Sequence, residues 1–445
     1  MLRLTILLCT CGPALLLGQL RLVISDDGSH IRNETAEEPF FYLGDTAWEL
    51  LHRANESETR AYLEDRRDKG FNVIQTVVLA ELDGLRTPNA NGDLPLENLD
   101  PTRWKESYFK HVDRVAEMAD SLGIFLGLLP TWGDKFNLKW GVGPEIFTPE
   151  NARTYGRMLG ERYADRNVIW ILGGDRSPED EEDFAIVRAM AAGLREAVGD
   201  RQLLTYHPQG GHRSTDFFAE DEWIDFHMFQ SGHGRRDDKR NYDFPQEARA
   251  AAPDQPVVNG EPAYEDHPIN WRPVNGWFDD FDTRQAAWWS VLSGTAGHTF
   301  GNHNIWQMWQ PGREPVSSAR TPWKDAVHYP GAAQIGHLGR LMRSLPYYEL
   351  EVDWDWLGDA PNSSGRETIV ARTPDGSLVL AYTPYGDTLE VDKDKLAGDG
   401  RYSWINPRTG TKIPFTPREV GQRLILDPPF APERGNDWVL MVRPN

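Results

Sequence analysis

With 445 residues, the chain is too long for one ordinary domain, and its length fits one large domain followed by a small one. Its 47 Lys and Arg against 68 Asp and Glu give a formal net charge of -21. An acidic surface repels nucleic-acid phosphates and anionic lipid head groups, so the charge argues against nucleic-acid partners and membrane-surface binding. The 17 Trp residues are unusually many; Trp concentrates in cores and at interfaces, including faces that stack on sugar rings, and most of them are expected to pack in cores.

Residues 1–18, MLRLTILLCTCGPALLLG, are predicted to form a secretory signal peptide. Arg3 provides the positive start, and the apolar stretch that follows is too short for a membrane anchor and is broken by Gly12-Pro13. We therefore expect a secreted or periplasmic protein, with no membrane insertion after signal removal. Both cysteines, Cys9 and Cys11, lie in this segment, so the mature chain has no disulfide. Lipoprotein-type cleavage at one of them is the less favoured alternative.

From about residue 40, short apolar runs alternate with helical patterns. Continuous apolar runs are typical of parallel strands that are buried on both faces. The eight strand candidates are residues 40–48, 71–79, 124–132, 168–175, 203–208, 224–232, 256–264 and 297–303. This pattern predicts an α/β fold, a (β/α)8 TIM barrel over residues 19–347. A doubly wound sheet is the alternative, but the GDTAW segment after the first strand is not a glycine-rich phosphate loop.

Capping residues predict where four helices begin, and proline follows the last three of them: Ser57, Asp100, Thr148 and Ser177. Residues 348–445 show a different pattern, with short alternating runs separated by turn residues, including a hairpin signature at 374–376. This pattern predicts a small antiparallel β-sandwich domain. It contains no cluster of catalytic residue types.

In (β/α)8 enzymes the active site lies at the carboxyl ends of the strands, so the residues that end each run are the candidates. Asp175 ends the fourth run and Glu261 the seventh, and both are predicted to be catalytic. The other strand ends provide the predicted substrate-binding residues: Asp45, Trp48, Trp132, His207, Gln230, His233, Tyr264, His303 and Trp306. Aromatic, imidazole and carboxyl groups with almost no Lys or Arg suit a neutral polyol better than a phosphorylated substrate.

The alternative role for Asp175 is a helix cap, but Ser177 before a proline is predicted to fill that position. Pro262 argues against a regular helix start at Glu261. A pair of carboxyls suits glycoside hydrolysis, because one must protonate the glycosidic oxygen while the other is ionised. No metal site or cofactor is expected, since the sequence has neither His-x-His after the first strand nor HEXXH, and no G-x-S-x-G elbow indicates a serine hydrolase.

Several segments resemble the apiosidase-like glycoside hydrolases of family 140. They are LGDTAWEL, GFNVIQ, VIWILGGD, NGEPAYE and WINPRTG, and the resemblance covers about residues 20–445. It implies a catalytic barrel followed by a β-sandwich that is named for collagen binding. It also implies a retaining mechanism with Asp175 as acid/base and Glu261 as nucleophile, acting on D-apiose linkages in the pectic polysaccharide rhamnogalacturonan II.

Two other functions are compatible with a barrel of this kind. Barrel glucanases and mannanases usually carry Asn-Glu after the fourth strand, where this chain has Gly174-Asp175. A non-catalytic carbohydrate-binding barrel is disfavoured by the intact acidic pair. The predicted partner in each case is a carbohydrate, and the sequence predicts no particular oligomeric state.

Overall fold

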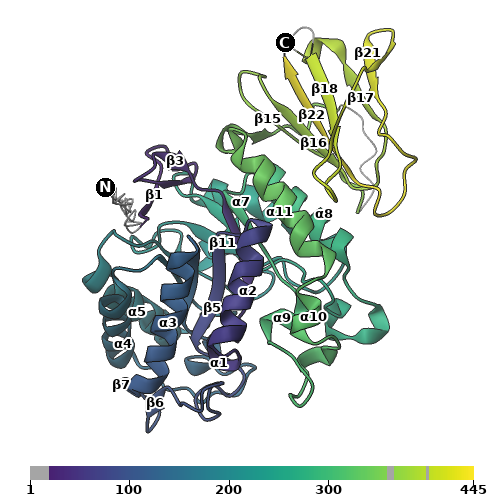
Figure 1. Cartoon of the computed structure of the whole chain (residues 1–445). Coiled ribbons are helices and arrows are strands. Elements are labelled where there is room, and N and C mark those ends of the chain that lie inside the picture. The colour runs from purple at the N-terminus through teal and green to yellow at the C-terminus, as the bar shows by residue number, and fades with distance from the viewer. Residues whose placement is uncertain (1–19, 358–364, 397–399, 445) are drawn as a thin grey trace, which may run out of the picture.

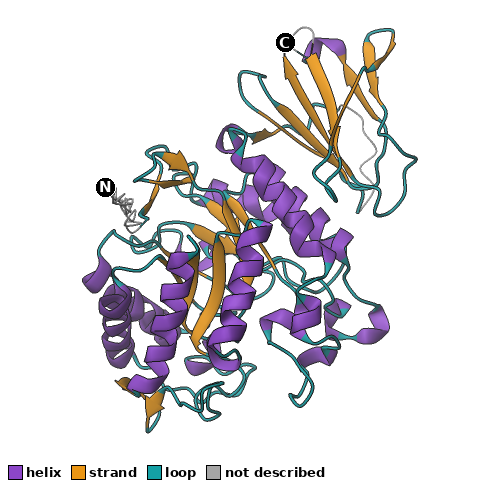
Figure 2. Cartoon of the chain, viewed as in Figure 1, coloured by secondary structure: helices purple, strands orange, loops and turns teal. Residues whose placement is uncertain are grey.

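Eight parallel strands form the centre of the large domain in the computed structural model, which describes residues 20–357, 365–396 and 400–444 (Figures 1 and 2). In chain order they are β4 (Tyr42–Thr46), β5 (Val73–Leu79), β8 (Phe125–Thr131), β9 (Val168–Leu172), β10 (Leu204–Tyr206), β11 (His227–Phe229), β12 (Val257–Asn259) and β13 (Gly297–Phe300). Each of the eight predicted runs contains one of them, so the predicted strand count is confirmed. The predicted signal peptide lies outside the described residues.

The strands curve into a nearly closed barrel in the order β10-β9-β8-β5-β4-β13-β12-β11. Between the two end strands, the backbone N–H of Asp225 donates to the Leu204 carbonyl at 2.9 Å. The Thr205 hydroxyl donates to the Phe226 carbonyl at 2.6 Å. These two hydrogen bonds connect β10 to the segment that leads into β11 and so bring the two end strands together. The predicted (β/α)8 barrel is confirmed.

Successive side chains on a strand point to opposite faces, which gives the barrel two cores. On β5, Val73 and Val77 belong to the core inside the barrel, whereas Ile74 and Val78 belong to the core beneath the helices. Every residue of β5 is buried. A strand that is buried on both faces explains the continuous apolar runs in the sequence.

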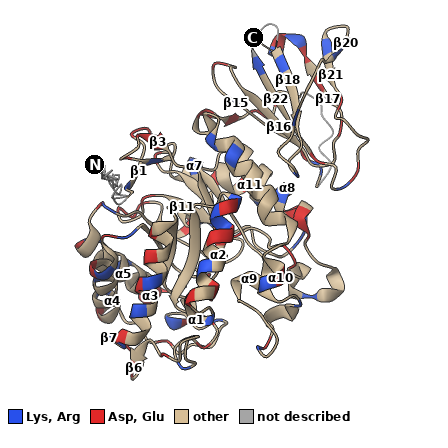
Figure 3. Ribbon diagram, viewed as in Figure 1, with Lys and Arg blue, Asp and Glu red and all other residues tan. Residues whose placement is uncertain are grey.

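Helices cover the outside of the strands, and most of the charged positions lie on these helices and on loops (Figures 1 and 3). The longer ones are α2 (Glu56–Lys69), α3 (Glu106–Ser121), α4 (Pro149–Tyr163), α5 (Glu181–Val198), α7 (Arg240–Ala251), α8 (Asp280–Leu292) and α11 (Pro330–Arg343). The short ones are α1 (Leu50–Arg53), α6 (Thr215–Phe218), α9 (His303–Trp306) and α10 (Trp323–Ala326). Within the described residues, none of the helices is both long and apolar enough to span a membrane.

Two of the predicted helix starts are wrong. The Asp100 side chain accepts hydrogen bonds from Thr102 and closes a local turn, so residues Asp100–Trp104 form the short strand β7, paired with β6 (Leu96–Glu97), and α3 begins at Glu106. The start predicted at Ser177 lies further along the chain, because Asp180 caps α5 by accepting from the backbone of residues 182 and 183.

The other two starts are close to the prediction. Thr148 caps α4 and forms a reciprocal capping box with Asn151. In α2 the cap is Asn55, two residues before the predicted Ser57. A three-stranded antiparallel sheet precedes the barrel, formed by β1 (Leu22–Ile24), β2 (Ile31–Asn33) and β3 (Glu38–Pro39).

The C-terminal domain consists of two antiparallel sheets, as the alternating runs predict (Figure 2). The larger has the order β14 (Glu351–Val352), β15 (Ile369–Arg372), β16 (Val379–Thr383), β22 (Trp438–Pro444), β18 (Gly400–Ile405) and β19 (Lys412–Phe415). The smaller has β17 (Leu389–Asp392), β21 (Arg423–Leu426) and β20 (Arg418–Val420). The indoles of Trp356, Trp404 and Trp438 lie in the core between them.

Helix α8 joins the two domains, and its residues from Phe281 to Leu292 are all buried. Trp288 stacks on Tyr382 of the sandwich, with ring centroids 5.9 Å apart. The Arg284 guanidinium donates twice to the Asp437 carboxylate, at 3.0 and 2.7 Å, and both side chains are buried. One helix therefore packs on the barrel and on the sandwich at the same time.

Candidate active site

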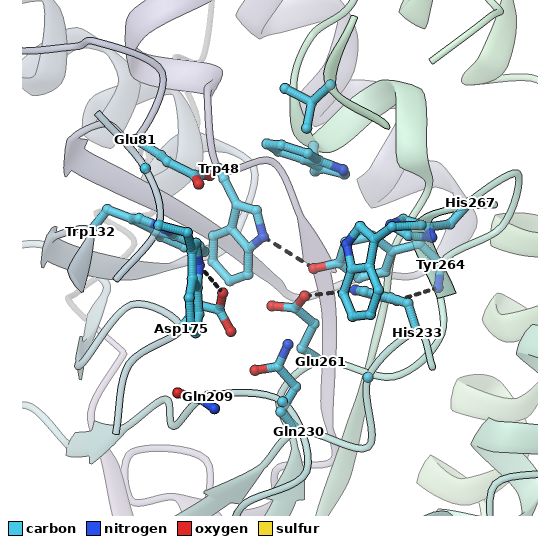
Figure 4. A pocket seen from close by; sticks show the side chains of 17 residues that line it. Trp48, Glu81, Trp132, Asp175, Gln209, Gln230, His233, Glu261, Tyr264 and His267 are labelled. Atoms are coloured by element: carbon cyan, nitrogen blue, oxygen red, sulfur yellow. Dashed lines mark hydrogen bonds and ion pairs between the residues drawn. The ribbon is translucent and has the colours of Figure 1, made fainter. Parts of the chain in front are cut away.

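A cavity of about 550 Å³ lies at the carboxyl ends of the barrel strands (Figure 4). Its walls contain the indoles of Trp48, Trp132, Trp140, Trp271 and Trp306. The same cavity holds three carboxyl groups, those of Glu81, Asp175 and Glu261. Figure 4 shows Asp175 on the side of Trp132 and Glu261 on the side of His233, with both carboxyls directed into the same space.

Asp175 is placed by an unusual turn at the end of β9. Gly173 and Gly174 have φ values of 99° and 67°, and Asp175 follows with 56°, so three successive residues adopt left-handed backbone. Asp is not excluded there, but such a conformation costs free energy and is concentrated at functional sites. A Cβ on Gly174 would lie 2.9 Å from the Thr131 carbonyl oxygen, so the turn also depends on close approach to the neighbouring strand.

The Asp175 carboxyl accepts a hydrogen bond from the Trp140 indole N–H at 3.0 Å. Arg176 lies 3.9 Å away at its nearest guanidinium nitrogen. Burial and the negative charge of Glu261 nevertheless raise the pKa of Asp175 to about 6, although His207, Arg176 and Trp140 act in the opposite direction. A carboxyl with this environment keeps its proton at mildly acidic pH, as a general acid must.

Glu261 has the opposite environment. The His233 Nε2 lies 2.9 Å from its Oε1, and the His207 Nε2 lies 3.2 Å from its Oε2, close enough for an ion pair although not aligned for a hydrogen bond. Burial raises the pKa of Glu261, but the two imidazoles outweigh it and lower the pKa to about 2. At a pH between about 2 and about 6, Glu261 is therefore ionised while Asp175 is protonated.

The proton positions on both imidazoles follow from their other contacts. The backbone N–H of Asp175 donates to the His207 Nδ1, and that of Tyr264 donates to the His233 Nδ1, each at 3.3 Å. A ring nitrogen that accepts carries no proton, so in the neutral rings Nε2 is the N–H that faces Glu261. Main-chain amides thus orient both donors toward the carboxylate.

Of the predicted substrate-binding residues, six line this cavity: Trp48, Trp132, Gln230, His233, Tyr264 and Trp306. The Trp48 indole N–H donates to the Tyr264 hydroxyl at 3.1 Å, which fixes both rings. Among the residues that the structure describes, three buried polar atoms of the lining have no hydrogen-bond partner: Trp132 Nε1, Gln230 Oε1 and Glu261 Oε2. Such atoms need partners, and a ligand rich in hydroxyl groups would provide them.

The other three predicted residues do not line the cavity. Asp45 is fully buried and points outward from β4 to helix α2, where the Tyr62 hydroxyl donates to it at 2.6 Å and Arg66 forms an ion pair with it. The prediction of substrate contact is wrong for Asp45, because strand alternation directs its side chain away from the barrel interior. His207 lies behind Glu261 and acts on it rather than on a ligand.

His303 also requires a correction. Its Nε2 lies 3.0 Å from the Val316 carbonyl oxygen, and its Nδ1 accepts from the Trp306 indole at 3.2 Å. Both ring nitrogens are therefore occupied, and the side chain holds the loop beside Trp306. The prediction of substrate contact for His303 is not supported by this arrangement.

The structure adds residues that the sequence did not indicate, among them Glu81, Trp140, Gln209, His267 and Trp271. Glu81 lies two residues after the end of β5, as Glu261 lies two residues after the end of β12, so the criterion that identified Glu261 could have identified it. Trp140 and Trp271 lie in long loops, where no periodic pattern marks them. Within the described residues, no cluster of three or more His, Cys, Asp and Glu side chains is arranged to hold a metal ion.

A (β/α)8 barrel with an unequal pair of carboxyls in an aromatic cavity is an arrangement that glycoside hydrolases use. Residues 25–349 match the family model described as "Apiosidase-like, catalytic domain". The chain belongs to this apiosidase-like family. Residues 355–443 match the model described as "Putative collagen-binding domain of a collagenase".

Solved structures agree with this placement. A structure described as a glycoside hydrolase has 28% identity and a TM-score of 0.85, with 96% of this chain and 97% of that chain covered. A family 5 glycoside hydrolase from Bacteroides vulgatus ATCC 8482 has 29% identity and the same TM-score, 0.85, covering 95% and 93%. A family 5 mannosidase from Rhizomucor miehei, at 12% identity, 73% and 99% coverage and a TM-score of 0.51, shares the fold alone. No curated protein matches the sequence.

Proposed function

We propose that the protein is a secreted, retaining glycoside hydrolase in which Asp175 is the acid/base and Glu261 is the nucleophile. The observation that carries the proposal is the placement of two carboxyls in one cavity with opposite surroundings: Asp175 accepts from an indole N–H, and Glu261 lies between two imidazoles. The pKa of Asp175 is raised to about 6 and that of Glu261 is lowered to about 2. Between these values one carboxyl is protonated and the other is ionised, which is the state that glycoside hydrolysis requires.

In the first step, a Glu261 oxygen attacks the anomeric carbon while Asp175 gives its proton to the glycosidic oxygen. The bond from the anomeric carbon to that oxygen breaks, and the leaving alcohol departs from a covalent glycosyl ester of Glu261. In the second step, ionised Asp175 takes a proton from water, whose oxygen attacks the anomeric carbon and displaces Glu261 as a carboxylate. Both groups then return to their starting protonation states.

The imidazoles of His207 and His233 serve the second step as well as the first. Negative charge returns to Glu261 when the ester breaks, and two fixed N–H groups that face its oxygens stabilise that charge without rearranging. Their orientation depends on main-chain amides rather than on the substrate. The donors are therefore in place before a substrate binds.

The substrate that we propose is a neutral saccharide, and more specifically a D-apiose linkage in a pectic polysaccharide of the rhamnogalacturonan II type. Indole walls and unpaired polar atoms support the general class. Membership of the apiosidase-like family supports the particular sugar. The predicted signal peptide supports secretion, since a polysaccharide of this kind must be cleaved outside the cell.

The test compares wild type with Asp175→Asn and Glu261→Gln on pectic side-chain fragments and on synthetic apiosides. We expect kcat/KM to fall roughly 100- to 10,000-fold for the first variant and at least as much for the second. In the wild type, kcat/KM should decrease above about pH 6, because the pKa of Asp175 sets the loss of the acid's proton. NMR should show that the first product has the anomeric configuration of the substrate.

Thermal unfolding provides the control, since both variants should melt within a few degrees of wild type. Asp45→Asn is the matched variant: it changes a fully buried carboxyl that is paired with Arg66, and it should lower the melting temperature instead. Binding of the fragments without hydrolysis would point to a non-catalytic barrel, and inversion of the anomeric centre would reject the double-displacement mechanism.

A further inference from the structure

Two loops at the mouth of the cavity expose apolar side chains to solvent. In the loop after β8, the exposed fractions are 49% for Leu138, 38% for Trp140 and 45% for Val142. In the loop after β12, they are 52% for Trp271 and 89% for Val274. Trp140 and Trp271 also line the cavity, so their indoles are accessible from its interior. Exposed indoles at a cavity rim indicate a contact surface rather than a core.

The loop that carries Trp140 is held in place by contacts with Arg176 and Asp134. The Arg176 guanidinium lies 3.9 Å from the centre of the Trp140 ring and covers one of its faces. Arg176 also donates to the carbonyl oxygens of Asn137, at 2.9 Å, and of Trp140 itself. The Asp134 carboxylate accepts the backbone N–H of Val142 at 3.0 Å. The indole is thus held in one position, and Trp140 lines the cavity whereas Arg176 behind it does not.

The contact between Trp140 and Asp175 places this indole on one side of the scissile bond. A general acid must touch the glycosidic oxygen, and that oxygen belongs to the leaving group. Because the Trp140 Nε1 lies 3.0 Å from the Asp175 Oδ2, the ring lies beside the path of the leaving group. Trp271 contacts His233 and His267 instead, at centroid distances of 5.9 and 5.7 Å, and therefore lies on the Glu261 side.

We propose that Trp140 is the leaving-group platform of the enzyme: its open face stacks on the apolar C–H face of the sugar that departs, while its indole N–H orients Asp175. This inference rests on the proposed function and adds the site for the second sugar. The proposal implies that the leaving group is itself a sugar. A flat indole beside a proton donor fits a sugar ring, whose hydroxyl groups lie at the edge of the ring. Trp140 would then act both in substrate selection and in positioning the acid.

The experiment compares two substrates of the same glycone for Trp140→Ala and Trp140→Phe. One is an oligosaccharide that wild type hydrolyses, and the other is the glycosyl fluoride, whose small leaving group needs neither a platform nor a proton from Asp175. We expect Trp140→Ala to lower kcat/KM for the oligosaccharide about 10- to 100-fold and for the fluoride less than about twofold. Trp140→Phe keeps an aromatic face and should lose less.

A second readout separates the two roles of the indole. The Trp140 N–H favours ionised Asp175, so its removal in Trp140→Phe should raise the pKa of Asp175 and move the alkaline limb of kcat/KM to higher pH. Leu138→Ala, on the same loop, should leave kcat/KM unchanged for both substrates. Trp271→Ala should lower kcat/KM for both substrates by the same factor, since Trp271 lies on the glycone side.

Equal losses of Trp140→Ala on both substrates, or an unchanged alkaline limb in Trp140→Phe, would overturn the inference while leaving the proposed function intact. A wild-type protein that hydrolyses neither the fluoride nor any oligosaccharide would remove the proposed function and the inference together.

Discussion

Glu81 is a carboxyl group that lies close to other carboxyls. It lines the cavity, and within the described residues its side chain has no hydrogen bond or ion pair. Burial and the nearby charges of Asp175 and Asp134 raise its pKa to about 8. A partly buried polar group that lacks a partner lowers stability, and such groups persist where a ligand uses them.

Replacing this residue should therefore separate stability from activity. In Glu81→Gln we expect the melting temperature to rise by roughly 1–3 °C near pH 8. The folded pKa lies above the unfolded one, so the acid destabilises the fold as pH rises through the window from about 4.5 to 8, and the gain should shrink at lower pH. Activity should decrease at the same time, because a substrate hydroxyl loses its partner.

Differential scanning calorimetry and kcat/KM between about pH 5 and pH 8 would check both parts. Glu179→Gln is a suitable control, since that carboxylate forms an exposed ion pair with Lys139 and should show neither effect. A melting temperature that falls in Glu81→Gln would mean that the carboxyl stabilises the fold through a contact of its own.

For single residues, the sequence predicted that Asp175 and Glu261 lie in one site because both follow buried strands, and the cavity contains both carboxyls. It could not separate Asp45 from the site. Asp45 lies within strand β4, and a single-residue difference in register decides whether a side chain points into the barrel or toward a helix. The roles of His207 and His233 depend on amides that are distant in the sequence.

Among the elements, the turn after β9 restricts most clearly which residues it can contain. Gly174 has left-handed backbone, and a Cβ there would lie 2.9 Å from the Trp132 Cα as well as from the Thr131 carbonyl oxygen. Neither backbone segment can move without disturbing β8. The sequence shows the two glycines but not this proximity, which arises only when the third and fourth strands pair.

We therefore expect Gly174→Ala to act on the site as well as on stability. Left-handed backbone alone should cost about 1–2 kcal/mol of unfolding free energy, and the steric conflict about 1–3 kcal/mol more. Because Asp175 follows directly, kcat/KM should fall at least about tenfold, as small displacements of an acid are costly. Gly123→Ala is the matched control, with a φ of 68° and, in the described part of the chain, no heavy atom within 4 Å of the added Cβ.

Urea unfolding would measure the stability difference, and the pH profile would reveal a displaced acid. Equal losses of stability in the two variants would show that the neighbouring strand tolerates the added methyl group.

The two wrongly predicted helix starts also concern single elements. Asp100 and Ser177 have the right residue type, but competing local hydrogen bonds and a better cap at Asp180 decide the outcome.

For the whole molecule, the contact between the domains is concentrated on helix α8. Asp437 of the sandwich accepts from Arg284 of this helix and from the Tyr382 hydroxyl at 3.2 Å, and Arg408 also lies within ion-pair distance. Removing one side of such a buried network leaves uncompensated charge, which typically costs about 3–5 kcal/mol.

Asp437→Asn should therefore lower the melting temperature strongly and favour unfolding of the sandwich before the barrel. Calorimetry should then show two transitions, or one that is broader than in wild type. Asp427→Asn is the control in the same domain, because the ion pair of Asp427 with Arg418 is exposed and should contribute under about 1 kcal/mol. A single unshifted transition in Asp437→Asn would show that apolar packing alone holds the domains together.

The burial of α8 from Phe281 to Leu292 has a consequence for the separated domains. The helix precedes the eighth strand, and Trp288 and Trp289 on its surface are covered by the sandwich or by residues next to it. A gene rearrangement that separated the two coding regions would leave a barrel with a large apolar surface in water, prone to aggregate. The barrel and the sandwich are therefore expected to require each other for a soluble fold.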